Sequence, residues 1–113
     1  MNVTTAHVGN VVVLRVQDTR LTYPILADFN TAVGNLIAGG EQRIVVDLGP
    51  VAYVDSATIG CLMDLYRQAT AAGGSLKLSG VQKRVETMIS MTGAQNFLEV
   101  HADEASALAS FGG

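Results

Sequence analysis

Residues 43–65 read RIVVDLGPVAYVDSATIGCLMDL, and this stretch decides the fold of the chain. Residues 44–46 are β-branched, which is typical of a strand, and Gly49-Pro50 breaks that strand. Further on, apolar side chains recur at spacings of three and four residues, which indicates one buried face of a helix (Ile59, Leu62, Met63 and Tyr66). The stretch therefore predicts a strand, a loop and a helix in succession.

Asp55 and Ser56 stand where the loop becomes the helix. Both residue types favour a helix N-terminus because their side chains accept hydrogen bonds from its free N–H groups. We therefore expect the Ser56 hydroxyl on the surface, at the positive end of the helix dipole, where a phosphate of about −1.5 to −2 charges is well accommodated. Capping preference alone also explains both residues, so a purely structural cap is the alternative interpretation.

This segment resembles the STAS domain of bacterial anti-sigma factor antagonists, in which a strand and a loop lead into Asp-Ser-Ser-Gly-Leu-Gly. Ser56 occupies the position of the serine that is phosphorylated in that family, so the resemblance implies phosphorylation of Ser56. Ala57 replaces the second serine and Thr58 the first glycine, which makes Thr58 a second candidate acceptor. Gly60 matches the second glycine, and we expect its missing side chain to let the helix pack close to a strand.

The polar segment 17–23 corresponds to a family loop that usually reads Gly-x-Leu-Asp and lies beside the phosphorylated serine. Asp18 stands at the glycine position and Leu21 at the aspartate position, so Asp18 is the local acidic substitute. The resemblance implies a partner-binding surface made of this loop and the start of the helix (Asp18, Arg20, Asp55, Ser56, Ala57, Thr58 and Ile59).

Periodicity and turn residues divide the rest of the chain. We predict strands at 3–7 and 11–16, joined as a hairpin by Gly9-Asn10, and further strands at 75–80 and 96–100. Helices are predicted at 24–38, at 81–91 and from 103 onward. His101 is expected in a solvated turn between the last strand and the last helix. Alternating strands and helices predict right-handed crossovers and a small mixed, mostly parallel sheet of four to five strands with about four helices. This is also the STAS architecture.

Composition narrows the class of protein. The 113 residues predict one domain spanning 1–113, and the net charge of −3 argues against nucleic-acid binding, since the Lys83-Arg84 pair is the only basic cluster. A single cysteine forms no internal disulfide, which suits a reducing cytoplasm. The N-terminus lacks a signal-peptide pattern, and no apolar run approaches the roughly 20 residues that span a membrane.

We do not expect an enzyme. Residues 54–58 lack both glycines of the Gly-x-Ser-x-Gly elbow of serine hydrolases, and only His7 and His101 could act as a base. Phosphate-binding loops and clustered His/Cys ligands are also missing, so neither a cofactor nor a metal is predicted.

The function implied by the resemblance is partner switching. The unphosphorylated protein would bind an anti-sigma factor that is also a serine kinase, phosphorylation of Ser56 would release it, and a serine phosphatase would reset the switch. Two alternatives are open at this point: a non-switching STAS accessory subunit of a transport ATPase, and the same switch acting on an output other than a sigma factor.

Overall fold

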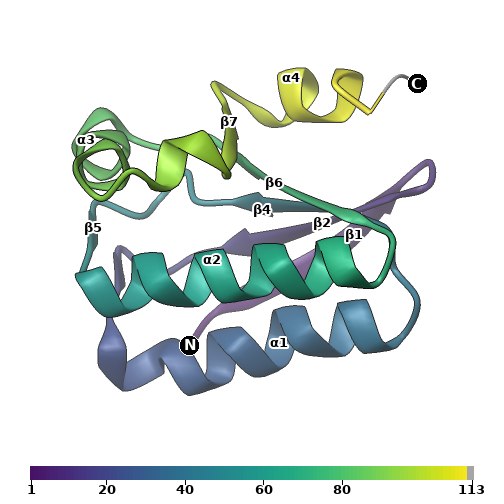
Figure 1. The fold of residues 1–113 in the computed structure, drawn as a ribbon, viewed down its shortest axis with the longest axis horizontal. Coiled ribbons are helices and arrows are strands. Elements are labelled where there is room, and N and C mark those ends of the chain that lie inside the picture. The colour runs from purple at the N-terminus through teal and green to yellow at the C-terminus, as the bar shows by residue number, and fades with distance from the viewer. Residues whose placement is uncertain (112–113) are drawn as a thin grey trace.

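A computed structural model describes residues 1–111 and contains a five-stranded sheet (Figure 1). The strand order is β1-β2-β4-β6-β7; β1 runs antiparallel to β2, and the other neighbours are parallel. The strands are β1 Val3–Val8, β2 Val11–Val16, β4 Arg43–Asp47, β6 Ser75–Ser79 and β7 Glu99–His101. The predicted mixed, mostly parallel sheet is confirmed, as is the β1–β2 hairpin, whose turn has Gly9 at φ +62°.

Three helices connect successive parallel strands, and the fourth follows the last strand. They are α1 Leu26–Ala38, α2 Ser56–Ala71, α3 Lys83–Met91 and α4 Glu104–Ala109, with short 3-10 turns η1 Tyr23–Ile25 and η2 Ala94–Asn96. Figure 1 shows α1 and α2 side by side along one face of the sheet, with α4 on the opposite side. The sheet therefore has one heavily covered face and one face covered mainly by a short terminal helix.

Side-chain alternation along the strands separates two apolar clusters. Leu14, Val46 and Leu78 point to the face under α1 and α2 and belong to the large main core. Val13 and Val45 point the other way, where Ala107 of α4 covers them in a much smaller cluster. The main core thus fixes α2, whereas α4 depends on a separate and limited set of contacts.

The last strand begins three residues later than predicted. Gly93 adopts φ +79°, a left-handed conformation that ends α3, and residues 94–96 then form η2. Leu98 donates its N–H to the Ala94 carbonyl at 2.9 Å, so pairing with β6 starts at Glu99. The expectation for His101 is wrong: it lies in β7 with its side chain 17% exposed.

A second, two-stranded parallel sheet was not predicted. It pairs β3 (Arg20–Leu21) with β5 (Tyr53–Val54), and the Ala52 N–H donates to the Thr19 carbonyl beside it. Two residues per strand are too few to give a periodic pattern of apolar residues, so a loop was predicted at 17–23. The pair brings that segment directly against the chain that enters α2.

Polar residues form a row across the less covered face. Arg15, Asp47, Ser79 and His101 are register partners on β2, β4, β6 and β7, so they lie side by side near the carboxyl ends of these strands. The Arg15 guanidinium donates two hydrogen bonds to the Glu104 carboxylate, Nε to Oε2 at 2.7 Å and the second nitrogen to Oε1 at 2.8 Å. This bidentate pair joins α4 to the sheet.

Asp47 of this row and Glu104 of α4 have opposite pKa shifts. Partial burial and the neighbouring Glu104 carboxylate raise the pKa of Asp47 from its ordinary 3.8 to about 6. The hydrogen bond from Arg15 lowers the pKa of Glu104 from 4.5 to about 2. Asp47 therefore opposes folding once it is ionised, whereas Glu104 supports folding wherever it is ionised.

We predict that Asp47→Asn stabilises the protein at neutral pH. Because the folded-state pKa is raised, the parent loses stability as pH rises from about 4 to about 6, and the variant lacks this loss. A shift of this size corresponds to about 3 kcal/mol when fully buried; partial exposure of the carboxyl reduces the expected gain to about 1 kcal/mol. Urea unfolding at several pH values measures it.

Glu104→Gln is the matched control with the opposite sign. It should lower the free energy of unfolding at neutral pH, because the stability contributed by Glu104 is present above its unfolded pKa of 4.5 and is lost as pH falls toward 2. An Asp47→Asn variant that is less stable than the parent at neutral pH would contradict the raised pKa.

Candidate functional site

The candidate site is built on Asp55, the N-cap residue of α2. Its backbone is extended (φ −104°, ψ 175°), and its Oδ1 accepts a hydrogen bond from the Thr58 N–H at 2.9 Å. Its Oδ2 accepts one from the Tyr23 N–H, also at 2.9 Å, which ties η1 to the start of α2. Slight desolvation raises the pKa of Asp55, but the hydrogen bonds from Thr58 and Tyr23 outweigh it and hold the pKa below its usual range. The cap is therefore an ionised carboxylate.

Ser56 is the first residue of α2, and its side chain is exposed, as predicted. Ala57 is exposed beside it. The capping hydrogen bonds are made by Asp55 and Thr58, and none of them uses the Ser56 hydroxyl. Cap and exposed hydroxyl are thus separate residues, which the sequence alone did not distinguish.

Two of the predicted surface residues are buried. Thr58 is 0% exposed, and its Oγ1 lies 2.6 Å from the Leu21 carbonyl oxygen and 2.7 Å from Asp55 Oδ1. Its hydroxyl therefore connects α2 to β3 inside the protein and is not available as a surface acceptor. Ile59 is 4% exposed and packs in the main core, so at most its edge faces a partner.

The segment 17–23 contributes unequally. Arg20 is exposed, and its guanidinium carbon lies 4.6 Å from the centroid of the Tyr53 ring, a cation–π contact between β3 and β5. Asp18 accepts a hydrogen bond from the Asn2 N–H at 2.8 Å, so its carboxylate holds the N-terminal segment in place. Arg20 is thus positioned next to the strand that precedes Ser56, whereas the Asp18 carboxylate is hydrogen-bonded to the N-terminal segment.

A groove lies on each side of the first turns of α2. One, of about 490 Å³, is lined by Ser56, Ile59, Gly60 and Met63 of α2 and by the segment that follows α3, including Phe97. The other, of about 660 Å³, lies between α2 and the η1–α1 segment, where its lining residues include Ala57, Gly60 and Cys61 from α2 and Tyr23, Pro24 and Asn30 from η1–α1. The exposed serine therefore borders a surface with two concave regions.

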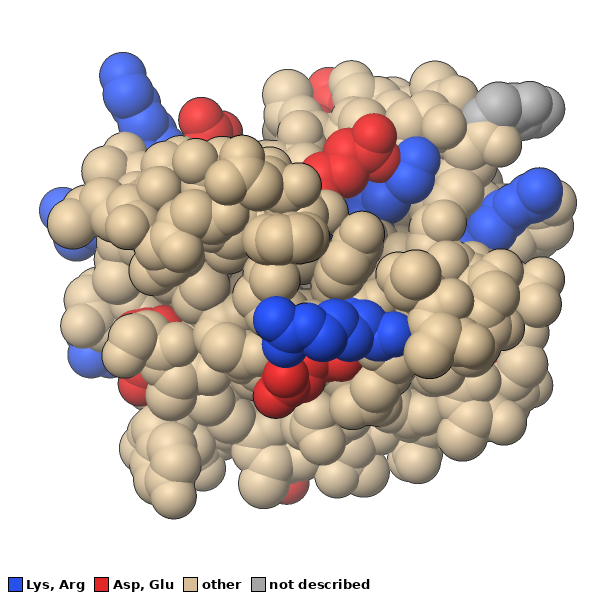
Figure 2. Space-filling model, viewed as in Figure 1, with Lys and Arg blue, Asp and Glu red and all other residues tan. Residues whose placement is uncertain are grey.

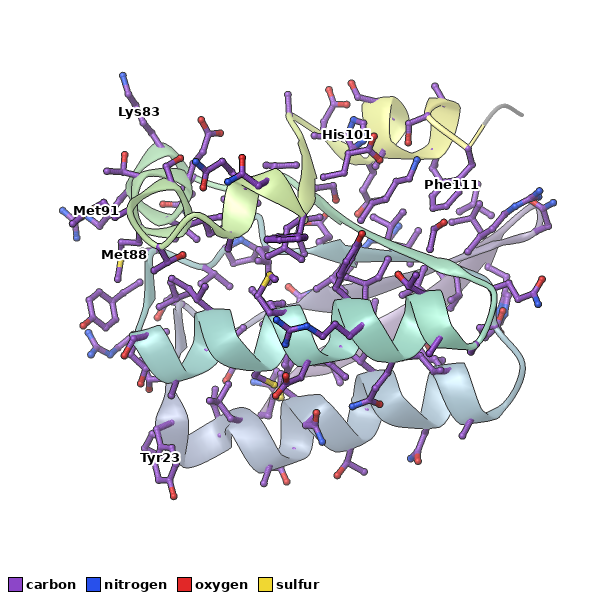
Figure 3. The ribbon with its side chains drawn as sticks, in the orientation of Figure 1. Tyr23, Lys83, Met88, Met91, His101 and Phe111 are labelled. Atoms are coloured by element: carbon purple, nitrogen blue, oxygen red, sulfur yellow. The ribbon has the colours of Figure 1, made fainter. Side chains whose placement is uncertain are left out.

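Large apolar side chains are exposed around these grooves. Tyr23 is 74% exposed, Met91 81% and Phe97 55%. Figure 3 shows Tyr23 on one side of the start of α2, with Met88 and Met91 on the other. These residues were not predicted, because nothing in a single sequence marks which apolar residues face solvent. Their clustering is typical of a protein-binding surface.

The expectation for Gly60 is wrong. A Cβ built on Gly60 would have no atom within 4 Å, and the residue is exposed. Its Cα faces the two grooves instead of a strand. The missing side chain thus widens the surface beside Ser56 and has no role in packing the helix on the sheet.

Ser79, His101 and Asp47 stand in one row, but Ser79 is 0% exposed and its Oγ makes no hydrogen bond, while His101 Nε2 lies 3.2 Å from Glu99 Oε2. This arrangement offers no activated, accessible nucleophile. Within residues 1–111 no group of three or more His, Cys, Asp or Glu side chains is placed to hold a metal ion, and no helix there is long and apolar enough to span a bilayer.

The fold and the exposed serine that follows the N-cap of α2 agree with one protein family. Residues 2–107 match the STAS domain family, and the chain belongs to that family. Among curated proteins it is similar to the anti-sigma-B factor antagonist of Bacillus subtilis (strain 168), with 30% identity over 64 residues. The match covers 57% of each protein, so the chain spans just over half the length of this relative.

Solved structures show the same fold. A STAS-domain anti-sigma-factor antagonist protein from Planctomyces limnophilus has a TM-score of 0.88 at 16% identity, covering 98% of both chains. The Bacillus cell fate determinant SpoIIAA in its phosphorylated form has a TM-score of 0.73 at 17% identity, covering 97% of this chain and 99% of that one. At these identities the likeness establishes the architecture.

We predict that Thr58→Val destabilises the protein by about 1–3 kcal/mol, because it removes a buried hydroxyl and leaves the Leu21 carbonyl without its donor. Ser56→Ala, two residues away, should change the free energy of unfolding by less than about 0.5 kcal/mol because its side chain is exposed. Chemical denaturation of both variants compares them directly. Equal effects would show that the buried Thr58 hydroxyl contributes little to the free energy of unfolding.

Gly60→Ala should stabilise the protein. The position is helical and open, so alanine gains helix propensity of about 0.5–1 kcal/mol without a clash. Gly9→Ala is the contrasting control, since φ +62° strains any side chain there and should make that variant less stable. A lower melting temperature for Gly60→Ala would indicate a contact that the structure does not contain.

Proposed function

We propose that this protein is an anti-sigma factor antagonist that works by phosphorylation-controlled partner switching. The observation that carries the proposal is an exposed serine hydroxyl at the first residue of a helix whose cap is made by other side chains. In the unphosphorylated state the surface around Ser56 binds an anti-sigma factor that is also a serine kinase. Phosphorylation of Ser56 releases it.

The site suits a modification that leaves the fold intact. The γ-phosphoryl group of ATP would pass to Ser56 Oγ, and the Asp55 and Thr58 bonds that hold the helix start need not change. The kinase supplies MgATP and the catalytic base, so this chain needs no cofactor and acts as substrate. A serine phosphatase in the cytoplasm would restore the hydroxyl.

The surface around Ser56 explains how a phosphate would act. Ser56 lines one groove and its neighbour Ala57 lines the other, so a partner that fills both must cover the hydroxyl. A dianion at that point adds charge to a contact that would otherwise exclude water, which costs binding free energy through repulsion and desolvation. The relatives named as anti-sigma factor antagonists, and the existence of a phosphorylated form of SpoIIAA, support the proposal that phosphorylation controls binding here.

The test uses the purified anti-sigma kinases of the source organism as a panel. With the kinase that binds the parent, Ser56→Ala should bind as tightly and keep binding in MgATP, whereas Ser56→Asp should bind about 30- to 150-fold more weakly, equivalent to about 2–3 kcal/mol. Intact mass after incubation with MgATP should rise by one phosphate in the parent and stay constant in Ser56→Ala.

Ser75 provides the matched control, since it is also exposed but lies at the other end of α2, where β6 begins. Ser75→Ala and Ser75→Asp should bind and become phosphorylated like the parent. If Ser56→Asp binds every kinase as the parent does, or if no kinase binds, partner switching is wrong, and a non-switching STAS subunit becomes the better description.

A further inference from the structure

Strand β1 forms one edge of the main sheet, and within residues 1–111 its outer side is paired with no other strand. It has six residues, whereas β7 at the opposite edge has three. The extensive contacts of β1 are with β2 alone, since α1 packs chiefly against α2. Most of its side chains are exposed, namely those of Thr4, Thr5, His7 and Val8. The edge is therefore a long row of backbone groups available for pairing with another strand.

The hairpin fixes which backbone groups of β1 point outward. The Gln17 N–H donates to the Asn2 carbonyl at 2.8 Å, which continues the β1–β2 register by one pair. Bonded and non-bonded pairs alternate in an antiparallel ladder, so the even-numbered residues of β1 bond inward to β2. The N–H and C=O groups of the odd-numbered residues point away from the sheet and have no backbone hydrogen-bond partner within residues 1–111 (Val3, Thr5 and His7).

Strand β1 lacks the features that normally protect an edge strand. It contains no lysine, arginine or proline, and its register with β2 runs through all six residues without a bulge. The two carboxylates near it lie at its ends and are bonded within the chain: Glu41 Oε2 lies 2.6 Å from His7 Nε2, and Asp18 accepts the Asn2 N–H. An approaching strand therefore meets neither a proline nor an unpaired cation along β1.

The hydrogen-bonding geometry of this edge selects an extended strand as its partner. Figure 2 shows acidic and basic side chains interspersed over the face that carries α1 and α2, without a large patch of one sign. Outward backbone groups at every second residue fit another strand, as in peptides that add to a sheet edge. A second copy of β1 has the same length, the same spacing of free groups and no permanent charge of its own.

Two copies of β1 can satisfy every outward group at once. With a two-fold axis at Thr5, antiparallel strands place Thr5 opposite the partner's Thr5 and Val3 opposite the partner's His7. These are bonded pairs, because all of these residues have their free groups on the outer side. A threonine pair is favourable across neighbouring strands. Between them Thr4 faces the partner's Ala6, so the side chains brought together there are small.

We propose that the protein forms a two-fold symmetric dimer in which β1 pairs antiparallel with β1 of a second copy, so that the two sheets become one. The interface is isologous, since the same strand supplies both sides. No residue of β1 lines either groove beside Ser56, so the pairing surface is separate from the surface proposed to bind the kinase. The dimer therefore presents two copies of that surface.

The first test measures the mass of the parent by analytical ultracentrifugation from about 1 μM to about 1 mM. The mass should rise from 11.8 kDa toward twice that value as the concentration increases. A parent that stays at 11.8 kDa over the whole range overturns the dimer.

Thr5→Lys should stay monomeric over the same range, because it places two ammonium groups face to face at the two-fold axis. Thr87→Lys is the matched control, since Thr87 is an exposed threonine on α3, which packs against β5 and η2. It should dimerise like the parent. If Thr5→Lys dimerises equally well, β1 is not the interface.

Amide hydrogen exchange locates the pairing in the unmodified chain. The N–H groups of Val3, Thr5 and His7 should become protected as the concentration rises, because they are bonded only in the dimer. Those of Thr4 and Ala6 should be protected at every concentration, since they bond to β2. Concentration-dependent protection elsewhere, with none at the outward positions, would overturn the proposal.

A cross-link tests the register. In a Cys61→Ala background, Thr5→Cys should be oxidised by glutathione disulfide to a covalent dimer, because facing Cα atoms in a bonded pair are about 5.5 Å apart and within reach of a disulfide. Thr87→Cys in the same background is the control and should link at least tenfold more slowly. Equal rates for the two variants would contradict the two-fold axis at Thr5.

The dimer and the phosphorylation switch are tested separately. Ser56→Asp should dimerise like the parent, and Thr5→Lys should still be phosphorylated by the kinase that binds the parent. Loss of the dimer in Ser56→Asp would show that the interface includes the start of α2 and would overturn pairing through β1. A dimer without any response to Ser56→Asp in kinase binding would leave the pairing intact and refute only the switch.

Discussion

The Asp55 carboxylate accepts hydrogen bonds from the N–H groups of Tyr23 and Thr58, which belong to segments far apart in the sequence. One oxygen caps α2, and the other fixes the turn that begins α1. The Thr58 hydroxyl, close to the same carboxylate and to the Leu21 carbonyl, adds β3 to this junction. The start of α2 is therefore held by Asp55 and Thr58, which lie on both sides of Ser56 in the sequence. The Ser56 hydroxyl takes no part in these hydrogen bonds.

The sequence predicted the parts of the fold that depend on local pattern. Spacings of three and four placed α2, Gly9-Asn10 placed the hairpin, and Asp55 was recognised at the helix start. The features that were not predicted depend on residues that are close in space but distant in the sequence. The β3–β5 pair is too short for a period, and the assignment of Thr58 to the interior required knowing that Leu21 lies beside it.

The same distinction explains the error at Gly60. A glycine near a helix start has two physical explanations, close packing or an open surface, and the residue type is identical in both. Only the surroundings decide, and here they are empty. The row from Arg15 to His101 could likewise not be predicted, since it arises from strand register between residues that are 22 or 32 positions apart in the sequence.

The face covered by α4 and the start of α2 differ in how their charged groups are paired. On the face with α4, Arg15 and Glu104 are neutralised by each other, so their contribution is structural and confined to the chain. At the start of α2, the Asp55 carboxylate accepts hydrogen bonds from backbone N–H groups, and Arg20 contacts the Tyr53 ring of the neighbouring strand. A charge introduced at Ser56 is then felt most by whatever approaches from solvent. Because the groups that hold the helix are separate from the exposed Ser56 hydroxyl, the proposed phosphorylation would change the surface while the bonds that hold the helix stay as they are.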